Sequence, residues 1–253
     1  MVESFYLPLD TDRFRSTGHT AGPWSPDSQH LGPPSALLVR QLELSAPGPD
    51  SLLARVTVEV LGPVPVADLT VRSWVIRPGR SVQLCGAELR AGDRPVATAA
   101  AWWMTTNDTT DVAAGVADPI PSIDAGQPAG TPEGWRSGYI EAMEWISIKG
   151  GLGTAGPATV WARQRVALVE GEVPSGMQRL MAVADSGNGV SNRLDPREWF
   201  FINTDLTVHT WRPPVGEWIG LDANTAIGPT GLGVATTTLH DRTGPVGTGN
   251  QAL

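Results

Sequence analysis

Three polar residues, Asp185, Asn203 and Gln251, could together activate a water molecule. A carboxylate can accept a proton from water, and a carboxamide can hold that water through both its donor and its acceptor. Each residue taken alone also fits a structural role, such as a helix end, a strand end or a solvated terminus. We single them out as a set because the chain contains an internal repeat in which all three are unusual.

The repeat becomes visible when the chain is laid on itself with a shift of 150 residues, which places Thr57 on Thr207 and Pro95 on Pro245. A fixed internal period indicates that one structural unit is built twice. The same shift pairs Asp185 with Ser35, Asn203 with Leu53 and Gln251 with Ala101. The second copy therefore carries a polar set where the first copy is largely apolar, which predicts one site in the second copy.

Each copy is expected to hold one helix and an antiparallel meander. Prolines near its start predict a helix over His30 to Leu44, after a loop from Thr17 to Gln29, and a second helix is expected over Ser175 to Ala184. The expected strands are Met1 to Asp12, Leu53 to Leu61, Asp68 to Ile76, Val82 to Arg90, Arg94 to Met104, Tyr139 to Ile148, Ala158 to Leu168, Phe200 to Trp211, Trp218 to Ala226, Gly233 to Leu239, and Val246 to the end.

This pattern predicts an α+β protein with two units. We expect an N-terminal unit at 1–104, a linker at 105–134 that is rich in Asp, Ala, Gly and Pro, and a C-terminal unit with the site at 135–253. An antiparallel sheet wrapped around one long helix is a hotdog unit, so the whole chain is expected to be a tandem (double) hotdog.

Composition excludes several classes of function. A net charge of −8 with scattered Lys and Arg argues against a nucleic-acid partner. The apolar run from Val96 to Met104 is far shorter than the roughly 20 residues that span a bilayer, so no membrane insertion is expected. Only one cysteine, Cys85, is present, and the start of the chain has no basic, apolar signal segment, so a cytoplasmic location is expected.

Several segments resemble the bacterial type II acyl-CoA thioesterases and their actinobacterial thioesterase-like relatives. They are HLGPPSALL at 30–38, RPGRSVQL at 77–84, MAVADSGNGVSN at 181–192, INTDLTVHTWRPPVGEWIGLDA at 202–223, and the HDRTGPVG…Q ending at 240–251. The resemblance runs over nearly the whole chain. It implies hydrolysis of acyl-CoA thioesters without a metal or organic cofactor.

The resemblance also implies roles for the site residues. In that family an Asp beside the second helix, a Thr on the next strand and a Gln on the last strand orient a water, and the matching positions are Asp185, Asn203 and Gln251. Because Asn replaces Thr, either Asn203 or the adjacent Thr204 could hold the water. Further candidates are the N–H groups of the Gly187 and Gly189 turn, for the oxyanion, and Arg212 among several arginines, for the CoA phosphates.

Two other functions stay open at this point. The first is a non-catalytic protein that binds acyl-CoA or fatty acid. It would have an apolar tunnel for the acyl chain but would not hydrolyse the thioester. A hydratase acting on enoyl-CoA could use His30 with Asp27, three residues earlier, as an acid–base pair. In each case exposed sheet edges favour self-association as a homodimer or a higher homo-oligomer.

Overall fold

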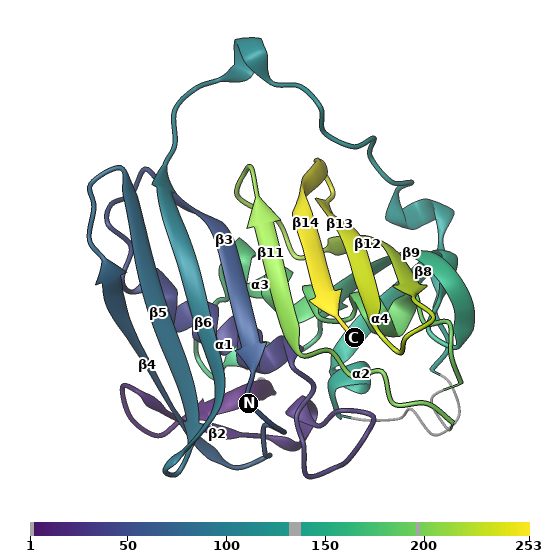
Figure 1. Ribbon diagram of the computed structural model, residues 1–253, viewed down its shortest axis with the longest axis horizontal. Coiled ribbons are helices and arrows are strands. Elements are labelled where there is room, and N and C mark those ends of the chain that lie inside the picture. The colour runs from purple at the N-terminus through teal and green to yellow at the C-terminus, as the bar shows by residue number, and fades with distance from the viewer. Residues whose placement is uncertain (1–2, 132–137, 196–197) are drawn as a thin grey trace.

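The computed structural model describes residues 3–131, 138–195 and 198–253, and the strands among them form one large sheet (Figure 1). The strands are β1 (Ser4–Pro8), β2 (Arg13–Ser16), β3 (Ser51–Val60), β4 (Asp68–Arg77), β5 (Val82–Ala91), β6 (Arg94–Thr105), β7 (Gln127–Pro128), β8 (Met143–Gly151), β9 (Thr154–Gln164), β10 (Ala167–Val169), β11 (Asp205–Thr210), β12 (Ile219–Ile227), β13 (Gly233–Asp241) and β14 (Gly244–Ala252). With few helices beside this sheet, the protein is of the α+β class.

The sheet has two halves that meet at its centre. One half runs β10-β1-β2-β4-β5-β6-β3 and the other runs β11-β14-β13-β12-β9-β8-β7. The halves join through the antiparallel pair of β3 and β11, in which Thr57 lies opposite Thr207. These two threonines are the residues that the 150-residue shift superimposes, so the repeat predicted from sequence is present in the strands and its two copies pair at equivalent positions.

Two helices, α1 (Gly32–Glu43) and α3 (Gly176–Ala184), pack against each other behind the sheet (Figure 1). They run in opposite directions. At one end a Cβ atom on Gly32 would collide with the carbonyl oxygen of Ala182. At the other end the Glu43 carboxylate accepts hydrogen bonds from Ser175 Oγ and Gln178 Nε2, both at 2.6 Å. The start of α1 therefore lies beside the end of α3.

The helices do not follow the register of the strands. Gly32 opens α1 and Gly176 opens α3, which are 144 residues apart rather than 150. The proposed equivalence of Asp185 with Ser35 is therefore wrong, and counting from the helix starts places Asp185 on Gln41 instead. The physical reason is a longer connection between the helix and the following strand in the second copy.

The second helix also differs from the single long helix that was expected. It ends at Ala184, and the chain resumes one short helical turn at α4 (Gly187–Val190). Asp185 occupies the break between them.

Four expected strands have other boundaries or another structure. The Tyr139 to Ile148 run begins as a short helix, α2 (Gly138–Ala142), because its apolar residues Tyr139, Ile140 and Ala142 are all buried rather than alternating. Of the strand expected from Met1 to Asp12, Met1 and Val2 lie outside the described residues; the described part contains β1, and β2 follows it. Ala158 to Leu168 spans parts of β9 and β10, and Phe200 to Trp211 becomes a strand only at Asp205.

The segment that leads from β6 to β7 arches over one end of the sheet, as Figure 1 shows. It contains two 3₁₀ turns, η2 (Thr110–Val112) and η3 (Ile123–Ala125), and β7, which pairs with β8; a third 3₁₀ turn, η1 (Gly18–Thr20), lies earlier in the chain. Trp161 anchors the segment by donating its indole N–H to the carbonyl of Pro121 at 2.9 Å.

The core lies between the helices and the sheet. Cys85 is fully buried there, as expected of a small apolar residue. Within the described ranges, no helix is long and apolar enough to cross a membrane.

Candidate active site

Asp185 forms the centre of the candidate site because the chain leaves the helical path there. It caps the C-terminal end of α3, and only 3% of the residue is exposed. Gly187 follows in a position that has no room for a side chain, since a Cβ atom would lie 2.5 Å from Thr237 Oγ1 and 3.0 Å from Gln251 Oε1. This close approach lets α4 sit against the sheet and holds Asp185 at the break between the two helices.

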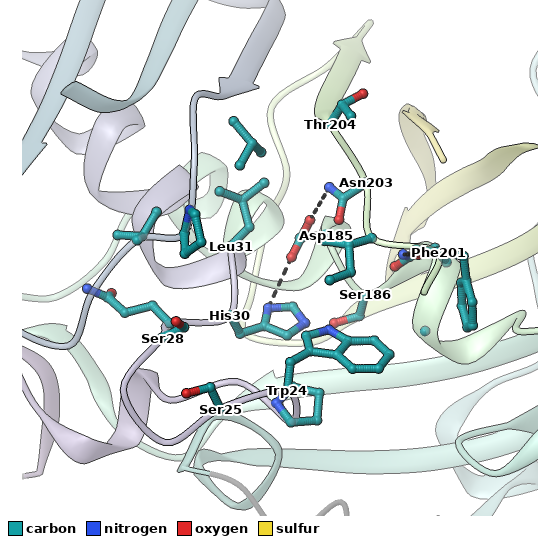
Figure 2. Close-up of a pocket in the computed structure, with 18 of the residues that line it drawn as sticks. Trp24, Ser25, Ser28, His30, Leu31, Asp185, Ser186, Phe201, Asn203 and Thr204 are labelled. Atoms are coloured by element: carbon teal, nitrogen blue, oxygen red, sulfur yellow. Dashed lines mark hydrogen bonds and ion pairs between the residues drawn. The ribbon is translucent and has the colours of Figure 1, made fainter. Parts of the chain in front are cut away.

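The three polar residues predicted from the repeat and the resemblance meet in space. Asn203 donates its side-chain N–H to Asp185 Oδ1 at 2.9 Å (Figure 2). Gln251 donates to the same oxygen at 3.2 Å and to the backbone carbonyl of Asp185 at 2.9 Å. The two amides therefore fix the carboxylate from two sides.

A fourth residue joins this cluster from the other unit. His30 Nδ1 lies 3.1 Å from Asp185 Oδ2, which Figure 2 marks with a dashed line. The imidazole ring stacks on Tyr139, with the ring centres 3.8 Å apart and the planes at 8°. The expected pairing of His30 with Asp27 is not the contact that forms, because Asp27 is exposed and His30 faces Asp185.

Burial governs the charges of this pair. It raises the pKa of Asp185, against the opposing effects of His30, the two amides and the Gly32 N–H. It lowers the pKa of His30, against the attraction of the Asp185 carboxylate. His30 Nδ1 and Asp185 Oδ2 lie 3.1 Å apart. The backbone N–H of Gly32 donates to Nδ1 at 3.1 Å and also reaches the Asp185 carboxylate, so it serves both groups.

A cavity of about 440 Å³ opens beside His30 and Asp185. Most of its wall is apolar, which suits a hydrocarbon chain. Both units contribute to it, with the first supplying residues between 23 and 64 and the second residues between 140 and 204. The apolar lining consists of Pro23, Trp24, Leu31, Val60, Leu61, Pro63, Val64, Ile140, Leu152, Phe201 and Ile202.

Asn203 and Thr204 are the two candidates for the position at which the resembled family has Thr, and the structure distinguishes between them. Asn203 points toward Asp185, whereas Thr204 is exposed and points away from it in Figure 2. Both residues line the cavity. Gln251 is 1% exposed and does not line it. Its Oε1 accepts a hydrogen bond from the backbone N–H of Asn188 at 3.0 Å. Gln251 therefore links α4 to Asp185 on the side away from the cavity.

The other candidate residues lie in different surroundings. Gly189 lines the cavity, and a Cβ atom there would meet nothing within 4 Å. Gly187 is buried against Thr237 and does not line it. Arg212 is bound to the Asp241 carboxylate, with its Nη2 2.8 Å from Oδ1 and also 2.8 Å from the carbonyl oxygen of Gly244. The structure therefore does not bring Arg212 to the cavity.

The part of the chain that the structure describes contains no group of three or more His, Cys, Asp or Glu side chains placed to hold a metal ion. His30 is the functional candidate that sequence reasoning assigned to the wrong partner. Its contact with Asp185 joins residues 155 positions apart, and no local pattern signals such a pairing.

Comparison with solved structures identifies the fold class of the protein. A candidate thioesterase from Novosphingobium aromaticivorans is similar, with 18% identity, coverage of 98% of this chain and 97% of that one, and a TM-score of 0.70. A candidate thioesterase II from Thermobifida fusca has 15% identity, 98% and 93% coverage and a TM-score of 0.74. A hot dog fold protein of unknown function from Alicyclobacillus acidocaldarius has 15% identity, 97% and 93% coverage and a TM-score of 0.73. The protein is thus of the hotdog class.

Family models give the narrower assignment. Residues 20–104 match the N-terminal domain of acyl-CoA thioesterases and residues 123–253 match their C-terminal domain. The chain belongs to the acyl-CoA thioesterase family. No curated protein sequence matches it significantly.

Proposed function

We propose that the protein hydrolyses acyl-CoA thioesters to the free acid and CoA in the cavity beside Asp185. One observation supports this most directly. A buried carboxylate, held by two amides and an imidazole, lies in the wall of an apolar cavity that is large enough for part of an acyl chain. Membership of the acyl-CoA thioesterase family supports the same reaction.

The chemistry needs an activated water, a binding place for the acyl chain and a donor for the developing oxyanion. In our proposal the Asp185 carboxylate accepts a proton from the water, while Asn203 and Gln251 fix the carboxylate. The water oxygen bonds to the carbonyl carbon, the carbon–sulfur bond then breaks, and the proton passes from Asp185 to the departing CoA sulfur. Gly189 lines the cavity, and its backbone N–H is the proposed donor to the oxyanion.

The experiment is to measure free thiol released from short, medium and long acyl-CoAs by the purified protein and by Asp185→Asn. General-base catalysis contributes about 10²–10⁴ in rate, so we expect kcat to fall by that factor in the variant. Glu43→Gln is a matched control, because it neutralises another hydrogen-bonded carboxylate at the opposite end of the α1–α3 contact. Circular dichroism should show all three proteins folded.

The possible outcomes separate the rival functions. Tight binding of acyl-CoA that is recovered unchanged after long incubation would identify a non-catalytic binding protein. Loss of the double bond of an enoyl-CoA, without thiol release, would identify a hydratase. Thiol release that survives Asp185→Asn would keep the hydrolase and remove Asp185 from its mechanism.

We also propose that the protein self-associates through one end of the first half-sheet. Large apolar side chains are exposed there on neighbouring strands. They are Trp74, Val75, Ile76, Val82 and Met104. Light scattering coupled to size-exclusion chromatography should give at least twice the 26.7 kDa chain mass, and Ile76→Glu should lower it. A monomer in the unmodified protein would contradict the proposal.

A further inference from the structure

We infer that the guanidinium of Arg94 binds a phosphate group of CoA at the rim of the cavity. This inference rests on the proposed hydrolysis and specifies how the protein recognises the part of its substrate that carries the sulfur. Three features support it: the apolar character of the cavity, the contact of Arg94 with the rim, and the absence of a carboxylate partner for Arg94 among the described residues.

The two parts of an acyl-CoA require different surroundings. The thioester carbon has to lie beside Asp185, where the mostly apolar cavity suits the acyl chain. The CoA part carries a 3′-phosphate and a pyrophosphate, which are ionised at neutral pH and are costly to take out of water without a partner. These phosphates therefore stay at the rim. Because the chain has a net charge of −8, a local cation is needed to attract them there.

One side of the rim is the loop that follows β3. Leu61, Gly62 and Pro63 line the cavity, and both Leu61 and Pro63 are exposed. The loop runs beside the start of β6, since the Leu61 N–H donates to the carbonyl of Val96 at 3.0 Å. In Figure 1, β3 ends and β6 begins at the same end of the sheet. Arg94, the first residue of β6, is therefore next to the rim.

The side chain of Arg94 lies on this loop. Its Nη2 donates to the carbonyl of Pro63 at 3.2 Å, and its Nη1 lies 3.3 Å from the position that a Cβ atom on Gly62 would take. Glycine at 62 thus leaves the space in which the guanidinium rests. A guanidinium has five N–H donors in a rigid fork, and the bond to Pro63 uses one of them. The fork can therefore bind phosphate oxygens while it stays attached to the rim.

Two properties together distinguish Arg94 from the other arginines of the described chain. Arg94 forms no ion pair with a carboxylate within residues 3–131, 138–195 and 198–253, whereas Arg90 pairs with Glu88 and Arg212 with Asp241. In the same ranges it is also the one Lys or Arg side chain that hydrogen-bonds to a residue of the cavity wall. An uncompensated positive charge therefore lies at the opening of the cavity.

The test is the affinity for CoA itself, measured by isothermal titration calorimetry with the unmodified protein and with Arg94→Gln. Glutamine keeps a polar side chain but removes the charge. Losing a hydrogen bond between charged groups weakens binding by about tenfold, so we expect the Kd of CoA to rise by that factor. Arg80→Gln is the matched control, because Arg80 is also exposed but lies in the turn before β5, at the opposite end of that strand from Arg94. It should bind CoA as the unmodified protein does.

Two shorter ligands assign the effect to phosphate. Pantetheine has the same thiol-bearing arm without any phosphate, so Arg94→Gln should bind it as tightly as the unmodified protein does. With 3′-dephospho-CoA, an effect of Arg94→Gln that disappears identifies the 3′-phosphate as the bound group, and an effect that persists identifies the pyrophosphate. Added salt should reduce the difference in CoA affinity between the two proteins, since salt screens exposed charges.

Three results would overturn the inference. They are an unchanged CoA affinity in Arg94→Gln, an equal loss of CoA affinity in Arg80→Gln, and an equal loss of pantetheine affinity in Arg94→Gln. The last result would show that Arg94 acts by holding the loop at Pro63 rather than by binding phosphate.

The binding measurements involve no turnover, so they separate this inference from the proposed function. A protein that binds CoA through Arg94 but releases no thiol from any acyl-CoA would keep the CoA site and lose the hydrolase. Thiol release with the same KM for acyl-CoA in Arg94→Gln and the unmodified protein would keep the hydrolase and remove the CoA site.

Discussion

Gly187 and Gly189 offer a comparison that tests how tightly α4 is packed. Both glycines lie on this four-residue helix, and neither has a positive φ, so alanine is compatible with the backbone at each position. A Cβ atom at Gly187 would lie 2.5 Å from Thr237 Oγ1, whereas one at Gly189 would meet nothing within 4 Å. The two alanine variants therefore differ in packing and share the same change in helix propensity.

The expected difference follows from these contacts. Alanine in a helix gains up to about 1 kcal/mol over glycine, and this gain applies to both variants. Overpacking a filled site costs about 1–3 kcal/mol, and this cost applies only to Gly187→Ala. For a chain of this size each kcal/mol moves Tm by about 2–4 °C, so Gly187→Ala should unfold about 2–12 °C below Gly189→Ala.

Thermal unfolding followed by circular dichroism and by tryptophan fluorescence measures this difference. Adding Thr237→Ala to Gly187→Ala removes the nearest colliding atom, so the double variant should lose less stability than the sum of the single changes. Equal unfolding temperatures for Gly187→Ala and Gly189→Ala would refute our explanation of why the chain has glycine at 187.

Three further predictions concern the ion pair of Arg212 and the cavity. Arg212→Ala should lower the free energy of unfolding by about 1.5–3 kcal/mol, measured in urea, without changing KM for acyl-CoA, because its guanidinium is bound to Asp241. Burial favours the neutral acid, yet the hydrogen bonds from Arg212 and Thr243 hold the pKa of Asp241 well below its usual range. This stabilisation is present above the unfolded-state pKa of about 4 and is lost as pH falls, so the urea midpoints of the unmodified protein and Asp241→Asn should converge between pH 5 and pH 2. Val60→Trp should shift thiol release toward shorter acyl-CoAs, because the larger side chain would occupy part of the cavity.

Much of the fold could be predicted from sequence because its signals are local. Proline and glycine mark most of the turns, so β4, β5 and β12 lie within a residue or two of the strands expected there. The repeat aligned Thr57 with Thr207, but their pairing was not predicted, because a repeat does not say which strands of the two copies meet. The start of the strand expected from Tyr139 to Ile148 is the helix α2 instead. This prediction was wrong because a short buried helix and a buried strand have similar composition.

The site was only partly predictable, for a different reason. The cluster of Asp185, Asn203 and Gln251 was predicted because repeat and resemblance pointed to the same positions. The comparison of Asp185 with Ser35 failed because the shift between the copies is 144 residues in the helices. His30 was matched to a neighbour in sequence, whereas its partner is set by helix packing, which local spacing does not encode.

The packing of α1 against α3 explains why the described chain has one such site. The antiparallel contact has two ends, and each end holds a carboxylate next to the other helix. At one end the half-buried Glu43 accepts from Ser175, the N-cap of α3, and from Gln178, whose backbone N–H that cap binds, and no imidazole takes part. At the other end Asp185 faces His30, and the cavity opens beside them. The duplicated fold thus supplies two similar positions for a carboxylate, and the side chains around each position decide whether it stabilises the helix contact or supports proton transfer.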